Sequence, residues 1–235
     1  MAKAIVIFSG GKDSVFALHT ALLQGFEIAA LITFKPSSTH PWYVHSPFVD
    51  YTWIQARLLH MEDRHIIIDI NSSDRFREQA EIRRALKDIT KKIDFDYIVL
   101  GIIASDAQRM LFADICEDLG VKLYTPFWGK DPYKHLLDII SSDIKFIITS
   151  INTWGLPRVF LGRVIDYELA LKIVALSKKY GFNPSFEGGE AETFVIYTPL
   201  FGAYKICIEY DIEVVSEYEG YVNPKKVSIC QLPQF

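Results

Sequence analysis

Short runs of apolar, β-branched residues alternate with longer amphipathic segments through the first half of the chain. Apolar runs of this length are typical of strands buried on both faces of a sheet. We place such strands at residues 4–8, 28–34, 65–70 and 97–101. Between the last two, apolar residues from Ile82 to Ile93 recur at helical spacing, and most charged residues fall elsewhere around the helix. This alternation predicts a parallel sheet covered by helices on both faces.

Residues that cap helices locate further elements. Ser105 can cap a helix that turns Cys116 inward and stops at Gly120. Asp131 can cap the next helix, because the proline that follows it, Pro132, is favoured in a first helical turn. The sequence therefore predicts two helices after the fourth strand, separated by a turn.

The second half of the chain mixes strands and helices. We expect a strand at residues 145–150, a helix at residues 166–180 and further strands at residues 194–197, 204–209 and 227–232. The predicted fold class is α/β, a parallel sheet with helices on both faces, followed by a smaller α+β C-terminal domain. We place the boundary after Trp128, which gives domains of residues 1–128 and 129–235.

Composition narrows the class of protein. The chain has 235 residues, half of them hydrophobic, so it can bury a substantial core. Its formal net charge is −4 and it has no long basic run, which argues against a protein that binds nucleic acid mainly by neutralising phosphates. No apolar run approaches the ~20 residues of a membrane span. We therefore expect a cytoplasmic protein with no membrane partner.

The three cysteines, Cys116, Cys207 and Cys230, are far apart in the sequence. Their spacing matches neither a CxxC redox pair nor a set of zinc ligands. We expect all three to be reduced and structural, with Cys116 in the core.

The clearest chemical motif is a glycine turn between the first strand and the helix that follows it. Two adjacent glycines let the backbone bring several N–H groups close to an anion, and the helix N-terminus adds partial positive charge. A Walker P-loop requires glycine where this chain has Val6, which disfavours that class. A plain glycine-rich turn remains the alternative. The motif consists of Ser9, Gly10, Gly11, Lys12, Asp13 and Ser14.

A second motif gathers three carboxylates about two glycines, ahead of an apolar strand. Crowded carboxylates repel one another, so the cluster is easiest to understand if a cation such as Mg²⁺ or ammonium compensates it. A solvated turn is the alternative. The motif consists of Glu187, Gly188, Gly189, Glu190, Ala191, Glu192 and Thr193.

Both motifs resemble those of a known enzyme family. The Ser-Gly-Gly-Lys-Asp-Ser string resembles the PP-loop of ATP pyrophosphatases, whose fold is adenine nucleotide alpha-hydrolase-like. Residues 187–193 and 101–109 resemble signature segments of the diphthine-ammonia ligases, and residues 126–128 and 199–201 fall in the family's order. The chain departs from the family at Ala107 and Ala191, where an aromatic residue is common.

The resemblance implies a reaction. Members of this family amidate diphthine, the modified histidine of translation elongation factor 2, with ammonium and ATP, giving diphthamide, AMP and pyrophosphate through an acyl adenylate. It implies ATP and Mg²⁺ as cofactors, and elongation factor 2 and ammonium as partners. No glutaminase motif is visible, so free ammonium is the expected nitrogen donor. A homodimer is a candidate assembly.

Site residues are assigned on this basis. We expect catalysis to involve Lys12, Glu187, Glu190 and Glu192. Besides the glycine turn, we expect ATP to contact Ile32, Thr33, Phe34, Gly101 and Ile102, because ligands of open α/β sheets bind beyond the carboxyl ends of the strands. We assign the acceptor to Ser105, Asp106, Gln108, Arg109, Gly188, Gly189, Thr193 and His45. Asp13 is the one candidate metal ligand, through Mg-ATP.

Several alternatives stay open. Ser105 and Asp106 also suit helix caps, and Arg109 suits a surface position. Residues 36–48 can be a mobile loop that closes over the site or a plain surface loop. Another PP-loop activity, such as tRNA thiolation or lysidine formation, is the enzymatic alternative. A nucleotide sensor without chemistry is the alternative outside enzymes.

Overall fold

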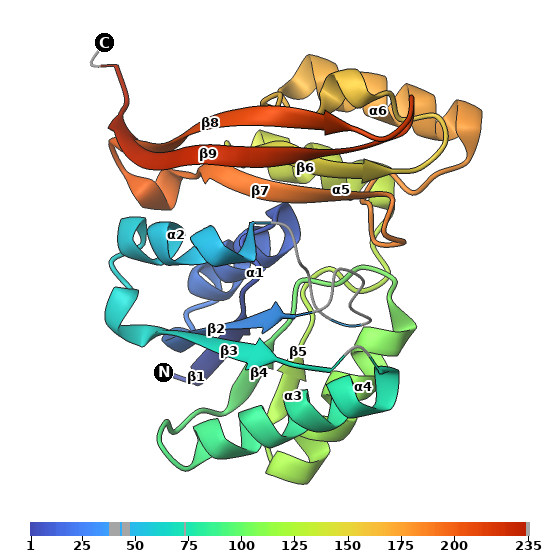
Figure 1. Ribbon diagram of the computed structural model, residues 1–235. Helices are drawn as coiled ribbons and strands as arrows, with labels where there is room; N and C mark the ends of the chain where they lie inside the picture. Colours follow the sequence, from blue (N-terminus) through green and yellow to red (C-terminus); the bar gives the residue numbers. More distant parts are fainter. Residues whose placement is uncertain (38–42, 44–47, 73, 234–235) are drawn as a thin grey trace.

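The chain folds around two β-sheets, one above the other in Figure 1, with helices between and around them. The computed structural model describes residues 1–37, 43, 48–72 and 74–233. The first sheet belongs to the N-terminal half of the chain and the second to the C-terminal half.

The first sheet is parallel, with the strand order β3-β2-β1-β4-β5. Its strands are β1 (Lys3–Ile7), β2 (Glu27–Pro36), β3 (His65–Ile70), β4 (Tyr97–Val99) and β5 (Lys122–Tyr124). The four predicted strands are confirmed. The sequence does not predict strand β5, because this strand is short and only partly buried. Strand β4 ends at Val99, two residues before the predicted end, because its pairing with β1 and with β5 stops there.

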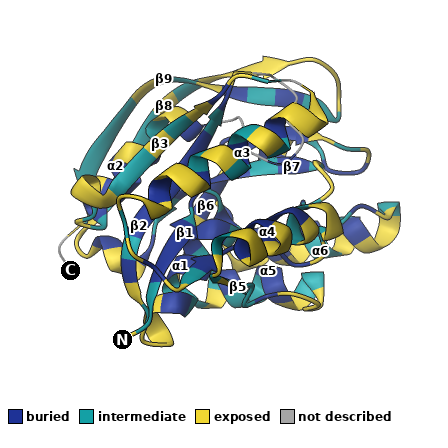
Figure 2. Cartoon of the chain, turned by 90° about the horizontal axis from the view of Figure 1, so that it is seen from below, coloured by how far each residue is buried: buried dark blue, intermediate teal, exposed yellow. Residues whose placement is uncertain are grey.

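Helices cover both faces of this sheet, as predicted. They are α1 (Lys12–Leu23), α2 (Thr52–Leu58), α3 (Arg75–Thr90) and α4 (Asp106–Leu119). Neighbouring residues of β1 enter different cores: Val6 packs with α1 and α2, and Ile5 packs with α3 and α4. In Figure 2, α3 and α4 show exposed residues on their outer faces and buried residues underneath. Leu22, next to the last residue of α1, is 39% exposed.

The second sheet is antiparallel, with the order β7-β6-β9-β8, and confirms the α+β character of this half. Its strands are β6 (Lys145–Asn152), β7 (Ala191–Tyr197), β8 (Tyr204–Val214) and β9 (Glu219–Gln231). Two helices, α5 (Pro132–Ser141) and α6 (Tyr167–Tyr180), pack against each other, and Asp131 and Asp166 cap them through backbone N–H groups. Single 3₁₀ turns occur at η1 (Val49–Tyr51), η2 (Glu62–Arg64), η3 (Arg158–Phe160) and η4 (Pro199–Phe201).

Strands β8 and β9 form a hairpin that extends beyond the predicted limits. Its pairs continue from Tyr204 opposite Gln231 to Val214 opposite Gly220. The residues near the tip of the hairpin are mostly exposed, so no apolar run in the sequence predicts this part of the strands. The partner strand, and not the local pattern, holds them extended.

A disulfide joins Cys207 and Cys230, so the prediction that all three cysteines are reduced is wrong. The two residues are 23 positions apart in the sequence, and the register of the hairpin brings their Cα atoms to 6.0 Å. Spacing along the chain does not reveal such a register. Cys116 is free and buried, as predicted.

The arrangement of the sheets decides where a ligand can bind. Strand β1 has β2 on one side and β4 on the other, so the chain reverses its direction of winding there. In open α/β sheets a crevice forms at the carboxyl ends of the strands at such a point. Helices α1 and α2 lie between the two sheets (Figure 1). The glycine turn before α1, residues 9–14, contacts β7 and is called the phosphate turn below. No helix in the described ranges has the length and apolar character needed to cross a bilayer.

Candidate functional site

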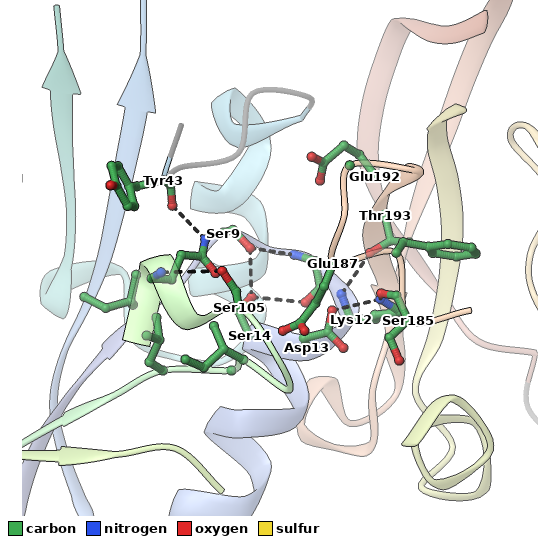
Figure 3. Close-up of a pocket in the computed structure, with 18 of the residues that line it drawn as sticks. Ser9, Lys12, Asp13, Ser14, Tyr43, Ser105, Ser185, Glu187, Glu192 and Thr193 are labelled. Atoms are coloured by element: carbon green, nitrogen blue, oxygen red, sulfur yellow. Dashed lines mark hydrogen bonds and ion pairs between the residues drawn. The ribbon is translucent and has the colours of Figure 1, made fainter. Parts of the chain in front are cut away.

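A cavity of about 350 Å³ opens at the carboxyl ends of β1, β2 and β4 (Figure 3). This is within the range of small-molecule sites, ~300–1,000 Å³. Its walls come from the turn after β1, the segment after β4 and the segment before β7. They include Ser9, Gly11, Lys12, Asp13, Ser14, Phe34, Gly101, Ile102, Ser105, Gln108, Glu187, Gly188, Gly189, Ala191, Glu192 and Thr193.

The phosphate turn follows β1 directly and leads into α1. Gly10 has a φ of 77°, which favours glycine, and Gly11 is the N-cap of the helix. The hydroxyl groups of Ser9 and Ser14 lie 3.2 Å apart, and the Gly11 N–H donates to Ser9 Oγ at 3.4 Å. The turn therefore presents hydroxyl groups and the N-terminus of a helix to the cavity, a combination that suits an anion.

Lys12 is almost fully buried, and its ammonium group is held by two partners. It lies 2.8 Å from Asp13 Oδ2 and donates to the Ser185 carbonyl oxygen at 2.5 Å. The ammonium also lies 5.2 Å from the centre of the Phe186 ring. Figure 3 shows Lys12 and Ser185 together on the side of the cavity formed by the second half of the chain.

Asp13 has a second partner in His135, whose Nε2 lies 2.9 Å from Asp13 Oδ1. Burial favours a higher pKa for Asp13, but the charge of Lys12 and the hydrogen bond with His135 outweigh it and lower the pKa to about 2. His135 is fully buried on α5, and its other nitrogen, Nδ1, has no hydrogen-bond partner among the described residues. Asp13 is therefore an anion that links α1 to α5.

Glu187 lines the cavity from the same segment before β7 that carries Ser185. Its two carboxylate oxygens accept hydrogen bonds from the backbone N–H groups of Ile103, at 2.5 Å, and Ala104, at 2.6 Å. Burial raises the pKa of Glu187, and these two hydrogen bonds offset part of that increase. Figure 3 shows Glu187 directed toward Asp13, while Glu192 lies apart from both.

The other members of the carboxylate motif have different surroundings. Glu190 accepts from the backbone N–H groups of Gly188 at 2.8 Å and Asn183 at 3.1 Å, so its carboxylate shapes its own loop and is outside the cavity wall. Glu192 lines the cavity. Thr193 lines it too, and its hydroxyl group accepts from the Lys12 N–H at 3.2 Å.

The segment after β4 divides between the cavity and the surface. Ser105 caps α4 by accepting from the Gln108 N–H, and both residues line the cavity. Asp106 and Arg109 pair with each other at 3.5 Å, with side chains 74% and 42% exposed. Arg109 also lies over the ring of Trp128. The structure thus does not bring Asp106 and Arg109 into the cavity wall.

At the ends of the strands, only some of the expected nucleotide contacts reach the cavity. Ile32 and Thr33 are buried in the sheet, where the Thr33 hydroxyl donates to the Phe8 carbonyl oxygen at 2.6 Å. Phe34 lines the cavity, as do Gly101 and Ile102. A Cβ on Gly101 would lie 2.4 Å from the Asp13 carbonyl oxygen, so glycine is required there.

The remaining expectations fall in three places. His45 lies outside the described residues, as does most of the segment 36–48. Ala191 is buried in the cavity wall, so this departure from the family pattern bears on the shape of the site. Ala107 is exposed on α4.

Sequence reasoning did not assign several residues of the site. Ser185 lines the cavity, while Gln55 and His135 contact residues of its wall. Tyr43, from the segment 36–48 offered as a loop over the site, also lines the cavity. His135 carried a usable signal, because it falls one turn into a helix whose cap was recognised. No signal in the sequence indicated Gln55, because a single glutamine in a short helix resembles any surface residue.

The site suits a nucleotide triphosphate better than it suits a bare metal ion. The hydroxyl groups and helix N-terminus of the phosphate turn are donors for phosphate oxygens. Within the described ranges, no group of three or more His, Cys, Asp or Glu side chains is arranged to hold a metal. Both oxygens of Asp13 already have protein partners. The donors of the chain therefore do not by themselves build a Mg²⁺ site.

Comparison with known proteins gives consistent matches. The family model described as the diphthamide synthase N-terminal domain matches residues 2–123, and that of the diphthamide synthase C-terminal domain matches residues 131–229. A protein of Schizosaccharomyces pombe named diphthine–ammonia ligase is 32% identical over 97% of this chain. This chain spans only 39% of that protein. Human and mouse proteins of the same name are 27% and 28% identical, over 93% and 98% of this chain and 87% and 91% of theirs.

Among solved structures, a predicted subunit of tRNA methyltransferase from Methanocaldococcus jannaschii covers 84% of this chain and 98% of its own. It is 17% identical with a TM-score of 0.42, a similarity too distant to bear on activity.

Proposed function

Because the chain belongs to the diphthamide synthase family, we propose that it is a diphthine–ammonia ligase that joins ammonia to the carboxylate of diphthine on elongation factor 2. The reaction consumes ATP and releases AMP and pyrophosphate. One observation carries the proposal: the phosphate turn at residues 9–14 and the carboxylates of Glu187 and Glu192 line the same cavity. A site with donors for phosphate on one wall and carboxylates on another can hold a nucleotide and a cationic nitrogen donor together.

The first step is attack of the diphthine carboxylate on the α-phosphorus of ATP. It forms an acyl adenylate and breaks the bond to pyrophosphate, which leaves with its electron pair. Negative charge grows on the leaving group, and Lys12, at the wall of the cavity, stabilises it. Ser9, Ser14 and the first turn of α1 hold the β- and γ-phosphates. Mg²⁺ would arrive with ATP and would offset the charge of its phosphates. Asp13 is the candidate ligand from the chain, and to bind the ion it would have to release Lys12 or His135.

The second step is attack of ammonia on the acyl carbon, with AMP as the leaving group. Ammonium must lose a proton before it attacks. Glu187 suits this task, because burial raises its pKa and makes it a better base than an exposed carboxylate. Glu192 adds negative charge to the wall that attracts ammonium. Glu190 contributes by shaping the loop that carries them.

The test uses the purified protein with elongation factor 2 carrying diphthine, ATP and ammonium. We expect pyrophosphate release together with the mass change of amidation at the modified histidine. Lys12→Ala is expected to slow pyrophosphate release by ~100-fold or more, as loss of a charge that stabilises a leaving group does.

Lys87→Ala is the matched control, because Lys87 is exposed on α3, far from the turn in the fold. It should behave as the unchanged protein. If pyrophosphate were released without amidation of the modified histidine, the protein would use ATP to activate an acceptor other than diphthine. Full activity of Lys12→Ala would contradict the role of the phosphate turn.

A further inference from the structure

Strand β7 lies at the edge of the second sheet, so no strand of the described ranges pairs with one side of its backbone. The phosphate turn covers part of that edge. The Val195 N–H donates to the Gly10 carbonyl oxygen at 2.9 Å. The Lys12 N–H donates to Thr193 Oγ1 at 3.2 Å. A turn that belongs to the first half of the chain is thus attached to a strand that belongs to the second.

The Val195 carbonyl oxygen, on the same edge, has a side chain as its partner. Gln55, on α2, is fully buried, and its Nε2 donates to the Val195 carbonyl oxygen at 2.8 Å and to the Gly10 carbonyl oxygen at 2.9 Å. One amide group therefore joins the turn to the strand and supplies donors that the turn itself does not provide.

The orientation of this amide is determined by its partners. An amide nitrogen donates two hydrogen bonds, whereas the amide oxygen only accepts them. Reversing the Gln55 amide would place its oxygen against two carbonyl oxygens. In the observed orientation, Oε1 is buried and has no hydrogen-bond partner within the described part of the chain. The two hydrogen bonds made by Nε2 offset this cost.

The position of the Gly10 carbonyl controls the next N–H group. In a trans peptide the C=O and the following N–H point in opposite directions. Since the Gly10 carbonyl points to β7 and Gln55, the Gly11 N–H points the other way, toward Ser9 Oγ in the cavity wall. A Cβ at Gly10 would lie 2.4 Å from Gln55 Oε1, so the glycine and the glutamine fit only together.

We propose that Gln55 is a positioning residue for nucleotide binding: its amide fixes the Gly10 carbonyl on the edge of β7 and so turns the Gly11 N–H toward the cavity. The proposal rests on the proposed function insofar as the turn binds ATP. The positioning of the turn itself can be measured without any nucleotide.

The main variant is Gln55→Met, which keeps the length of the side chain and removes the donors. Without ATP, we expect amide exchange of Val195 and of residues 10–12 to become roughly tenfold faster or more. With ATP, we expect KM for ATP to rise about tenfold while kcat changes much less, because the turn must then be ordered by the nucleotide. Unchanged exchange and unchanged KM would overturn the proposal.

A second variant guards against a protein that merely folds poorly. Gln55→Glu can donate one hydrogen bond when its carboxyl group is protonated and none when it is ionised. KM for ATP in this variant should therefore rise with pH relative to the unchanged protein. A KM ratio independent of pH counts against the proposal.

Ser177→Ala is the control for lost stability alone. It removes a buried hydrogen bond, from Ser177 Oγ to the Phe182 carbonyl oxygen, at a distance from the cavity. It should lower the melting temperature without raising KM for ATP. If the unchanged protein neither binds ATP nor releases pyrophosphate, the proposed function fails, while amide exchange in Gln55→Met still decides the role of Gln55.

Discussion

At the scale of single residues, the site depends on a chain of polar contacts that crosses the molecule. Lys12 donates to the Ser185 carbonyl oxygen, Asp13 accepts from Lys12, and His135 contacts the other oxygen of Asp13. The Ser185 hydroxyl donates to the Pro132 carbonyl oxygen, at the start of the helix that carries His135. The contacts form a closed ring, so the ammonium group that faces the cavity is positioned from two directions.

Asp13→Asn tests this ring through its dependence on pH. The pKa of Asp13 is lowered from 3.8 to about 2, so the folded protein binds fewer protons than the unfolded chain between these values. The ionised Asp13 carboxylate therefore stabilises the folded protein fully above pH ~4, and this stabilisation is lost as the pH falls toward about 2. We expect Asp13→Asn to lower the free energy of unfolding at pH 7 by about 2 kcal/mol. The free energy of unfolding of this variant should also decrease less steeply in acid than that of the unchanged protein.

The measurement is urea unfolding at several pH values from neutral to acid. Asp63→Asn serves as the control, since Asp63 is exposed in a 3₁₀ turn, and its curve should follow that of the unchanged protein. If the free energy of unfolding of Asp13→Asn decreased in acid as steeply as that of the unchanged protein, the ionised Asp13 in this ring would contribute no stability.

At the scale of elements, the site exists because several of them approach one another closely. The segment after β4 contacts the first turn of α1, with no room for a side chain at Gly101. The loop before β7 is attached to the same segment through Glu187. The cavity walls are therefore held by backbone contacts as much as by side chains.

Gly101→Ala should disturb this approach. The added Cβ would lie 2.4 Å from the Asp13 carbonyl oxygen, and backbone cannot yield as a flexible side chain does. We expect a loss of about 2 kcal/mol or more in the free energy of unfolding, together with a higher KM for ATP.

Gly25→Ala is the matched control. Gly25 has a φ of 81°, and no atom of the residues that the structure describes lies within 4 Å of an added Cβ, so only backbone strain is introduced. Its stability should fall by ~1 kcal/mol without a change in KM for ATP. Equal effects of the two substitutions on KM would show that the contact between Gly101 and α1 does not shape the site.

At the scale of the whole molecule, neither half of the chain completes the cavity. The phosphate turn and the segment after β4 come from the first half, and Ser185, Glu187 and Thr193 come from the second. The domain boundary between residues 128 and 129 stays a prediction. Residues from both sides of that boundary line the cavity.

ATP should therefore stabilise both halves together. Hydrogen exchange with and without ATP is the measurement, and we expect slower exchange both in residues 9–14 and in residues 193–195. At 100 times Kd the expected gain in stability is about 2.7 kcal/mol. Protection confined to residues 9–14 would show that the contact with β7 does not respond to the nucleotide.

By itself, the sequence determined the features that depend on neighbouring residues. Apolar runs predicted strands β1, β2, β3 and β4 of the first sheet, and capping residues such as Ser105 and Asp131 located helices. The glycine turn before α1 was recognised because it is continuous and its chemistry is local. These features follow from steric preferences and hydrogen bonding within a few residues.

Only the tertiary structure decided which distant residues meet. It placed Gln55 against Gly10, joined Cys207 to Cys230, and separated Glu187, in the cavity, from Glu190, outside it. The physical reason is that strand register and the docking of the two sheets result from burial summed over many residues. No local pattern carries that sum, so these contacts could not be predicted from the sequence.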